Sequence, residues 1–275
     1  MDRVSRIDQV KIYTGKCFRI FKNEKGYKSF ISTAIITVLI SFVLGEEMFR
    51  ELHATQTGAF AVICGCIWIG IFNSIQSICR ERAIIKREYR TGLRISSYVI
   101  AHMVYEMVIC FTEALIVVII LLIATAGGPN TSLIMGSFLD LLITVFLVIF
   151  SADLLAMIVS SIVKTETAAM TVMPFVLILQ LILSGVIFIL GGFMQLFSNL
   201  TISKWGVNAI CAISNVIAST TEKDIALLAE RDWLKDAYRH EPEYLLQIWM
   251  ILCLFIVIYG IICTIALKFV DKDKR

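Results

Sequence analysis

Acidic side chains within apolar runs are the first candidates for chemistry in this sequence. Glu106 and Glu113 lie seven residues apart and therefore share one face of a helix, and His102 precedes Glu106 by four residues. Asp153 lies in the next apolar run. Ionisable groups are costly to bury in hydrocarbon and are commonly functional there, so one hypothesis is a proton relay. The other is that these acids hydrogen-bond backbone and hydroxyl groups between helices, which we favour because neither run contains Lys or Arg.

Motifs for metal binding or covalent catalysis do not stand out. The sequence has no Gly-rich phosphate loop and no Gly-x-Ser-x-Gly elbow, and its three histidines are scattered. Cys64 and Cys66 point in different directions on a helix, which makes them a poor metal pair, and the other six cysteines are read as packing residues. We therefore expect no catalytic residue, no metal and no bound cofactor in this chain.

The composition is that of an integral membrane protein. Hydrophobic residues make up 58% of the 275 residues and charged residues only 17%, with a mean hydropathy of +0.84. A soluble domain would carry more charge. Residues 1–275 are expected to form a single membrane domain without an ATPase domain, and the charged start predicts no cleavable signal peptide.

Six apolar runs are each long enough to cross a bilayer, which needs roughly 20 apolar residues. They predict an all-α membrane protein with spans at about 27–44, 59–79, 97–126, 136–163, 167–191 and 244–270. Residues 7–21 have an apolar stripe among basic residues, which predicts an interfacial helix before the first span. Residues 192–219 are too apolar for a free loop and too broken for a span, so we expect re-entrant helices there, before the sixth span.

The charged segment from Arg80 to Tyr98 interrupts the apolar runs between the second and third spans. Six of its residues are basic and two, Glu81 and Glu88, are acidic. At helical spacing these residues form an amphipathic helix that Gly92 would end. A basic loop alone would satisfy the positive-inside rule, but the ordered pattern indicates a further role.

The distribution of basic residues predicts the orientation. Of the 25 Lys and Arg residues, 19 fall on the side that holds both termini and the charged segment, and six fall on the other side. Because basic residues concentrate on the cytoplasmic side, both termini are predicted to lie there, in a multi-pass protein of the plasma membrane.

Several short patterns, in this order, resemble the membrane domain of type-2 ABC exporters. The patterns are Glu81, Arg87-Glu88-Tyr89, Gly92 and Ser96-Ser97-Tyr98 in the charged segment, then Glu106, Pro174, Leu183-Ser184-Gly185 and Trp205-Gly206-Val207-Asn208-Ala209. The resemblance is strongest to the G subfamily, which includes the white-type and multidrug half-transporters with the type V exporter fold. It covers nearly the whole chain.

The resemblance implies a permease subunit that works as a homo- or heterodimer with cytoplasmic ABC ATPase subunits, which would bind ATP and Mg. The charged segment and the turn after the fourth span would contact the ATPase through Glu81, Arg82, Arg87, Glu88, Tyr89, Lys164 and Glu166. A substrate cavity at the dimer axis, between the second and fifth spans, would be lined by Cys66, Ile69, Asn73 and Ile178, with Val186 and Ile187 as a plug. From the residues alone, Asn73 could equally well be a packing residue.

The function predicted from the sequence is outward transport of an amphipathic or hydrophobic molecule (lipid, drug-like or peptide) by alternating access. Membrane lipid is an expected partner and nucleic acid is not. Two alternatives remain at this point. One is a proton-coupled secondary transporter using Glu106, Glu113 and Asp153, and the other is a membrane scaffold or immunity protein that transports nothing.

Overall fold

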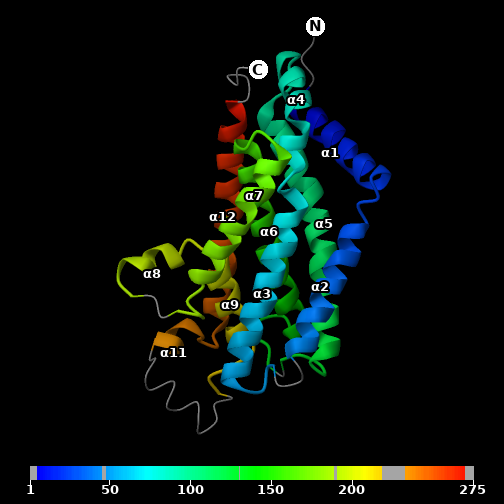
Figure 1. Cartoon of the computed structure of the whole chain (residues 1–275). Coiled ribbons are helices and arrows are strands. Elements are labelled where there is room, and N and C mark those ends of the chain that lie inside the picture. Colours follow the sequence, from blue (N-terminus) through cyan, green and yellow to red (C-terminus); the bar gives the residue numbers. More distant parts are fainter. Residues whose placement is uncertain (1–4, 45–47, 130, 189–190, 219–232, 270–275) are drawn as a thin grey trace.

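The computed structural model describes residues 5–44, 48–129, 131–188, 191–218 and 233–269, which form helices and connecting turns without any strand. Figure 1 shows the long helices side by side in one bundle. The helices are α1 (Arg6–Asn23), α2 (Lys28–Leu44), α3 (Leu52–Ser74), α4 (Ser77–Arg90), α5 (Ile95–Ala124), α6 (Ser137–Ile162), α7 (Glu166–Ile182), α8 (Phe193–Ser198), α9 (Ile202–Ile213), α11 (Trp233–Ala237) and α12 (Pro242–Lys268).

Four helical segments of the described chain are long and apolar enough to cross a membrane: α5, α6, α12 and the stretch from α3 through α4. The pair α1 and α2 passes the same test only as one unit, although it is bent by 70°. Helix α7 is apolar but has only 17 residues. Length and composition thus support four or five of the six predicted spans. The sixth predicted span runs to residue 270, which lies outside the described residues.

The fifth predicted span, 167–191, is too long. Helix α7 ends at Ile182, and Gly185 lies beyond it with φ +80°, a left-handed conformation in which a helix does not continue. The Ser184 hydroxyl donates to the carbonyl of Leu181 and so competes for the last carbonyls of the helix. Residues 189 and 190 lie outside the described part of the chain.

Helix α6 is the central helix of the bundle. It packs against α3, α5, α9 and α12, and it also contacts α4 and α7. It crosses α3 closely at Gly70, where an added Cβ would lie 2.3 Å from the carbonyl oxygen of Ile149. Only a residue without a side chain lets the two backbones approach so closely. Gly70 therefore determines the distance between α3 and α6.

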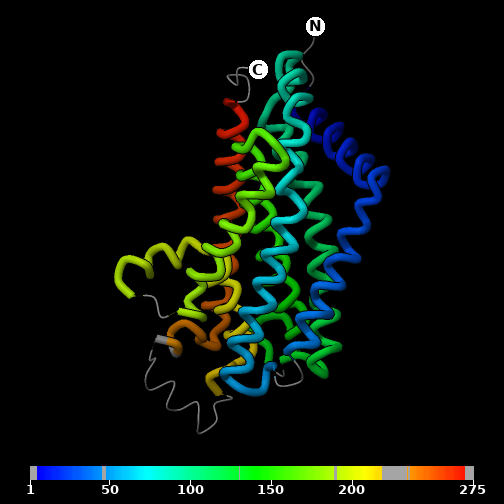
Figure 2. The backbone as a smooth tube through the Cα atoms, viewed as in Figure 1, coloured from blue at the N-terminus to red at the C-terminus, as the bar shows by residue number. Residues whose placement is uncertain are grey.

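Helix α1 is tilted away from the bundle direction and slants outward from the end of the bundle where α4 and the last turns of α12 lie (Figures 1 and 2). Ser5 caps its first turn by accepting a hydrogen bond from the backbone N–H of Asp8. Tyr13 packs edge-to-face on Tyr98 of α5, and Phe18 packs in the same way on Tyr105. The amphipathic helix predicted over residues 7–21 is therefore present and is docked on α5.

Residues 192–218 contain α8 and α9 rather than a free loop. Nearly all of α9 is buried, against α3, α6, α7 and α12. The carbonyl oxygen of Ala212 in α9 lies 2.7 Å from Nδ1 of His240, near the start of α12. Helices packed on protein were predicted here, while their re-entrant path through a membrane stays a prediction.

We predict that Gly70→Ala lowers stability by about 1–3 kcal/mol, the usual cost of overpacking, because the new methyl group meets a backbone carbonyl that cannot rotate away. The measurement is the Tm of the purified protein in detergent. Gly15→Ala is the matched control, since an added Cβ at Gly15 on α1 meets no atom within 4 Å. An unchanged Tm for Gly70→Ala would contradict the close crossing of α3 and α6.

Candidate functional site

Helix α4 begins where the long helical stretch breaks after Ser74, and its start is capped by a side chain of another helix. The Ser160 hydroxyl of α6 accepts hydrogen bonds from the backbone N–H groups of Ile78 and Cys79, at 3.1 Å each. The first N–H groups of a helix have no partner within the helix, and burial without one is costly. Ser160 therefore fixes the start of α4 against α6.

The end of α6 is held in return by a side chain of α4. Arg82 Nη1 donates to the carbonyl oxygens of Ser161 at 2.8 Å and Val163 at 3.1 Å. The last carbonyls of a helix lack partners and carry partial negative charge, which a guanidinium stabilises. Helices α4 and α6 thus satisfy each other's ends, and the turn that leads to α7 is tied to α4.

The opposite face of α4 is bound to α1. Lys16 forms an ion pair with Glu81 at 3.3 Å, and the Tyr98 hydroxyl donates to the same carboxylate at 3.2 Å. The Tyr13 hydroxyl donates to Glu88 at 2.8 Å. Glu81 and Glu88, which the sequence predicted as contacts to an ATPase, therefore make contacts within the chain.

Tyr13 stays a donor over the physiological pH range. Its partial burial, together with the Glu88 carboxylate that accepts its hydrogen bond, raises the pKa of Tyr13 above its ordinary value. Gln9 adds two backbone contacts beyond α4, donating to the carbonyl of Gly92 at 3.4 Å and accepting from the N–H of Arg94 at 3.1 Å. A row of polar contacts thus runs along the α1–α4 interface.

Four of the seven predicted coupling residues remain exposed at this end of the bundle: Arg87, Tyr89, Lys164 and Glu166. Lys164 and Glu166 lie in and directly after the turn that Arg82 ties to α4. Glu81, Arg82 and Glu88 are partly buried and bind within the chain. The exposed set forms two patches, on α4 and at the start of α7, and the Arg82 contacts join the elements that carry them.

The three intramembrane acids have different surroundings. Glu113 is buried and accepts from Asn73 Nδ2 at 2.6 Å, from the Thr33 hydroxyl at 3.4 Å and from the Ser29 hydroxyl. It therefore joins α5 to both α2 and α3. These bonds agree with the interpretation that we favoured from the sequence, in which acids hydrogen-bond between helices.

Glu106 and Asp153 lie on either side of Ser74, and all three are buried. Within the described residues, neither oxygen of the Asp153 carboxyl nor the Ser74 hydroxyl has a hydrogen bond of normal geometry. His102, one turn before Glu106 on α5, lies 3.7 Å from the Cys17 sulfur and against the Tyr98 ring. The two ion pairs found among the described residues, Lys16–Glu81 and Glu24–Arg80, do not involve these acids.

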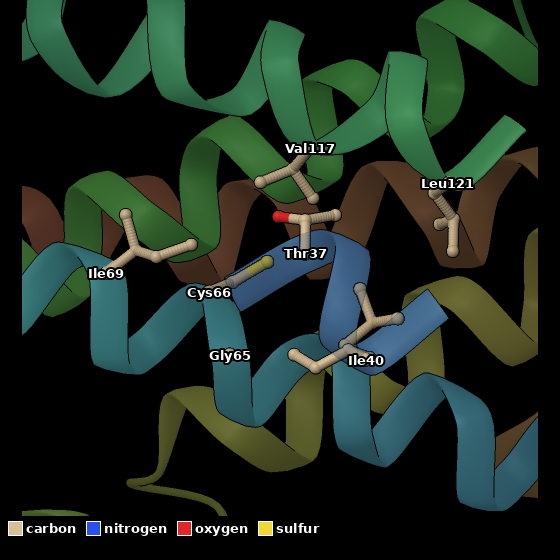
Figure 3. A pocket seen from close by; sticks show the side chains of 8 residues that line it. Thr37, Ile40, Gly65, Cys66, Ile69, Val117 and Leu121 are labelled. Atoms are coloured by element: carbon tan, nitrogen blue, oxygen red, sulfur yellow. The ribbon is translucent and has the colours of Figure 1, made fainter. Parts of the chain in front are cut away.

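The residues predicted to line a substrate cavity do not surround one common cavity within this chain. Cys66 and Ile69 are buried and face Thr37 of α2 and Val117 of α5 around a cavity of about 10 Å³ (Figure 3). Asn73, on the same face of α3, binds Glu113. The other predicted residues, Ile178, Val186 and Ile187, lie on α7 and in the turn after it. Ile178 and Ile187 are about half exposed there, at 48% and 53%.

Comparison with known proteins decides the family. The family model described as "ABC-2 type transporter" matches residues 8–215, which is most of the chain. The chain belongs to the ABC-2 type transporter family. It is also similar to the ABC transporter ATP-binding/permease protein of Mycobacterium tuberculosis strain H37Rv, with 28% identity over 212 residues. The match covers 72% of this chain and 24% of that protein, so the chain spans only about a quarter of its relative's length.

Membership makes this chain an ABC-2 permease domain, and its apolar helices make it a multi-pass membrane protein. Two features of this ABC-2 domain escaped the sequence analysis: the caps between α4 and α6, and the docking of α1 on α4. Hydroxyl partners for the acids were favoured from the sequence, but Ser29, Thr33 and Asn73 were not named as the partners of Glu113. These three residues gave a usable signal, because polar residues inside apolar runs need partners.

We predict that Ser160→Ala in this ABC-2 domain loosens the start of α4 by about 1 kcal/mol, as loss of a helix cap does. Amide hydrogen exchange in a peptide covering residues 77–82 should then be about fivefold faster. Ser161→Ala is the control, since the Ser161 hydroxyl donates to Ile158 of its own helix rather than to α4, and the carbonyl that Arg82 binds is retained. Equal exchange in the two variants would contradict the cap.

We also predict that Tyr13→Phe loosens α1 while its ring stays packed on Tyr98. A hydrogen bond to a charged group contributes about 1.5–3 kcal/mol, and partial exposure reduces this, so we expect about 1 kcal/mol and severalfold faster exchange over residues 6–23. Tyr89→Phe removes a hydroxyl from an exposed tyrosine and serves as the control. Exchange over α1 that is the same in both variants would show that the Glu88 contact does not hold α1.

Proposed function

We propose that this chain is the permease subunit of an ATP-driven ABC exporter that carries an amphipathic or hydrophobic molecule out of the cytoplasm. Family membership supports a permease domain. Export, and the proposed place in the G subfamily, rest on the sequence patterns around Glu81, Pro174 and Trp205. The substrate class rests on the mostly apolar side chains that α7 leaves exposed, among them Phe175, Ile178 and Leu179.

The joint between α4 and α6 is the observation that supports coupling to an ATPase. Arg82 ties α4 to the turn before α7, so a force applied to exposed Arg87 is transmitted to Lys164 and Glu166 and to the ends of α6 and α7. A partner that pushes on this surface would tilt membrane helices. We propose that the partner is a cytoplasmic ABC ATPase subunit, on which ATP and Mg bind.

Six crossings and a dimer complete the proposal. Helices α2 and α7 would be the two short spans, with 17 residues each, which a bilayer accommodates by thinning locally. The excess of Lys and Arg then places both termini in the cytoplasm, at the plasma membrane. The substrate path would run along the exposed face of α7 at the dimer axis, with Ile178 in its wall and Val186 and Ile187 near its exit. Cys66 and Ile69 are left out of it, because they are buried against α2 and α5.

The acids Glu106 and Asp153 favour a second candidate, a proton-coupled transporter. Their position around Ser74, with the Asp153 oxygens unbonded within the described residues, is what a proton-binding group requires. This candidate predicts transport driven by a pH gradient in proteoliposomes without ATP, abolished in Asp153→Asn. A scaffold without transport activity would show neither ATP-driven nor pH-driven movement.

The deciding experiment is purification of the chain from its native membrane, with identification and assay of any ATPase that accompanies it. We predict that an ABC ATPase copurifies and that the double charge reversal Arg87→Glu and Lys164→Glu reduces its recovery at least tenfold, because both residues are exposed where we place the contact. Lys11→Glu, a reversal at an exposed residue of α1, is the matched control.

Two results would count against this proposal. Absence of any ATPase from the folded, purified protein would remove the exporter interpretation. Undiminished recovery of the ATPase by the double variant would keep the exporter but place its contact elsewhere. Glu88→Arg is unsuitable for this purpose because it would also break the Tyr13 contact between α1 and α4.

A further inference from the structure

A polar cavity of about 600 Å³ lies between α1, α4 and α5, extending to the end of α3. Its lining includes Lys16 and Glu24 of α1, Arg80 and Glu81 of α4, and His102 and Glu106 of α5. Two ion pairs lie on its wall, Lys16–Glu81 at 3.3 Å and Glu24–Arg80 at 2.9 Å. The Glu24–Arg80 pair is about half exposed and so remains accessible to a polar ligand.

A second cavity, of about 910 Å³, is an apolar groove between α2 and α3. Ile36 and Leu39 form its α2 side, and Ala61, Cys64 and Trp68 form its α3 side. Lys28 lies at one end of its lining, at the first residue of α2. Trp68 is stacked on Phe72 and half exposed, as expected of a wall open toward lipid.

The two cavities adjoin. Ser29, Phe72 and Asn73 belong to the linings of both, and the Ser29 hydroxyl donates to Asn73 Oδ1 at 3.1 Å. A single molecule that lies over these three residues would place one end in the polar cavity and the other in the apolar groove. Each cavity alone is within or near the range of about 300–1,000 Å³ that drug-sized ligands occupy, and together they exceed it. The combined site therefore fits a larger amphipathic molecule whose polar end is compact.

The charged residues of the site indicate which kind of headgroup fits it. Three basic residues (Lys16, Lys28 and Arg80) and three acidic residues (Glu24, Glu81 and Glu106) line the two cavities. A balanced set of this kind suits a group that carries both charges, with its anionic part at Arg80 and Lys28 and its cationic part at Glu24. If a phosphate takes Arg80 from Glu24, a headgroup ammonium can replace Arg80 as the partner of Glu24, whereas a purely anionic headgroup leaves that carboxylate uncompensated.

We propose that these two cavities bind one zwitterionic phospholipid, with its headgroup between α1 and α4 and its acyl chains in the groove between α2 and α3. The site is separate from the substrate path along α7, and it does not depend on whether an ATPase partner exists. Because the headgroup contacts both α1 and α4, the bound lipid stabilises the contact between them.

The test uses the whole chain, purified in detergent and stripped of lipid, with phosphatidylethanolamine or phosphatidylglycerol of identical acyl chains added. Native mass spectrometry counts the lipids that stay bound. We expect one phosphatidylethanolamine per chain, bound at least tenfold more tightly than phosphatidylglycerol. Glu24→Gln should remove this preference, because Glu24 binds the cationic group that only phosphatidylethanolamine carries.

Groove-filling variants test the acyl-chain half. Ala61→Phe places a ring in the groove from α3 and should weaken phosphatidylethanolamine binding at least tenfold. Ser32→Trp fills it from α2 at an exposed position, so it serves where Ala61→Phe does not fold. Val257→Phe adds similar bulk to the exposed face of α12 and should leave binding unchanged. Binding that is equal for both lipids, or that is unaffected by Ala61→Phe and Ser32→Trp, would overturn the proposal.

Discussion

The hydrogen bonds between α4 and the end of α6 are the constraint on which the arrangement of this end of the bundle depends. The chain must leave the long helix at Ser74 and start a new one, which exposes N–H groups that have no partner in the helix. Ser160 satisfies two of them, and Arg82 satisfies two carbonyls of the α6 end in return. With about 1 kcal/mol for a cap and about 1.5–3 for a charged hydrogen bond, the pair is strong enough to keep α4 from swinging independently of α6.

The buried polar groups of the bundle are arranged around the same central helix. Gly70 lets α3 approach α6 closely, and one helical turn further along α3, Ser74 reaches Asp153 of α6 and Glu106 of α5. Glu113 joins α5 to α2 and α3 through hydroxyl and amide donors. Polar contacts between membrane helices contribute only modestly each, about 0.6–2 kcal/mol. Their main effect here is positional, since Glu113 links α5 to α2 and α3 and so fixes the rotation of these three helices.

The sequence predicted which stretches are helical better than it predicted what their faces touch. Apolar runs located α2, α5, α6 and α12 to within about two residues at each end, because such runs must be helical in a membrane. The predicted span 59–79 overlaps α3 but misses its start by seven residues and its end by five. The end of α7 was missed because it depends on a left-handed glycine at 185, which leaves no trace in hydropathy. The family resemblance implied that Cys66, Ile69 and Asn73 line a substrate cavity, and in the structure their face of α3 is turned to α2 and α5. Helical period carries no information about the neighbouring helix, so the sequence could not predict these contacts.

For the same reason, the sequence could not show that Glu81 and Glu88 contact α1. These contacts change the mechanism expected of the charged segment. A carboxylate on an amphipathic helix can face a partner protein or another part of its own chain, and only the position of α1 distinguishes these cases. With both acids bound to α1, a force on exposed Arg87 reaches three elements at once: α1 through Glu81 and Glu88, α6 through Arg82, and α5 through Tyr98. Helix α4 is therefore attached to three other helices and is not free to move independently of them. Any partner that moves α4 must also displace α1, which makes the first helix part of the moving unit.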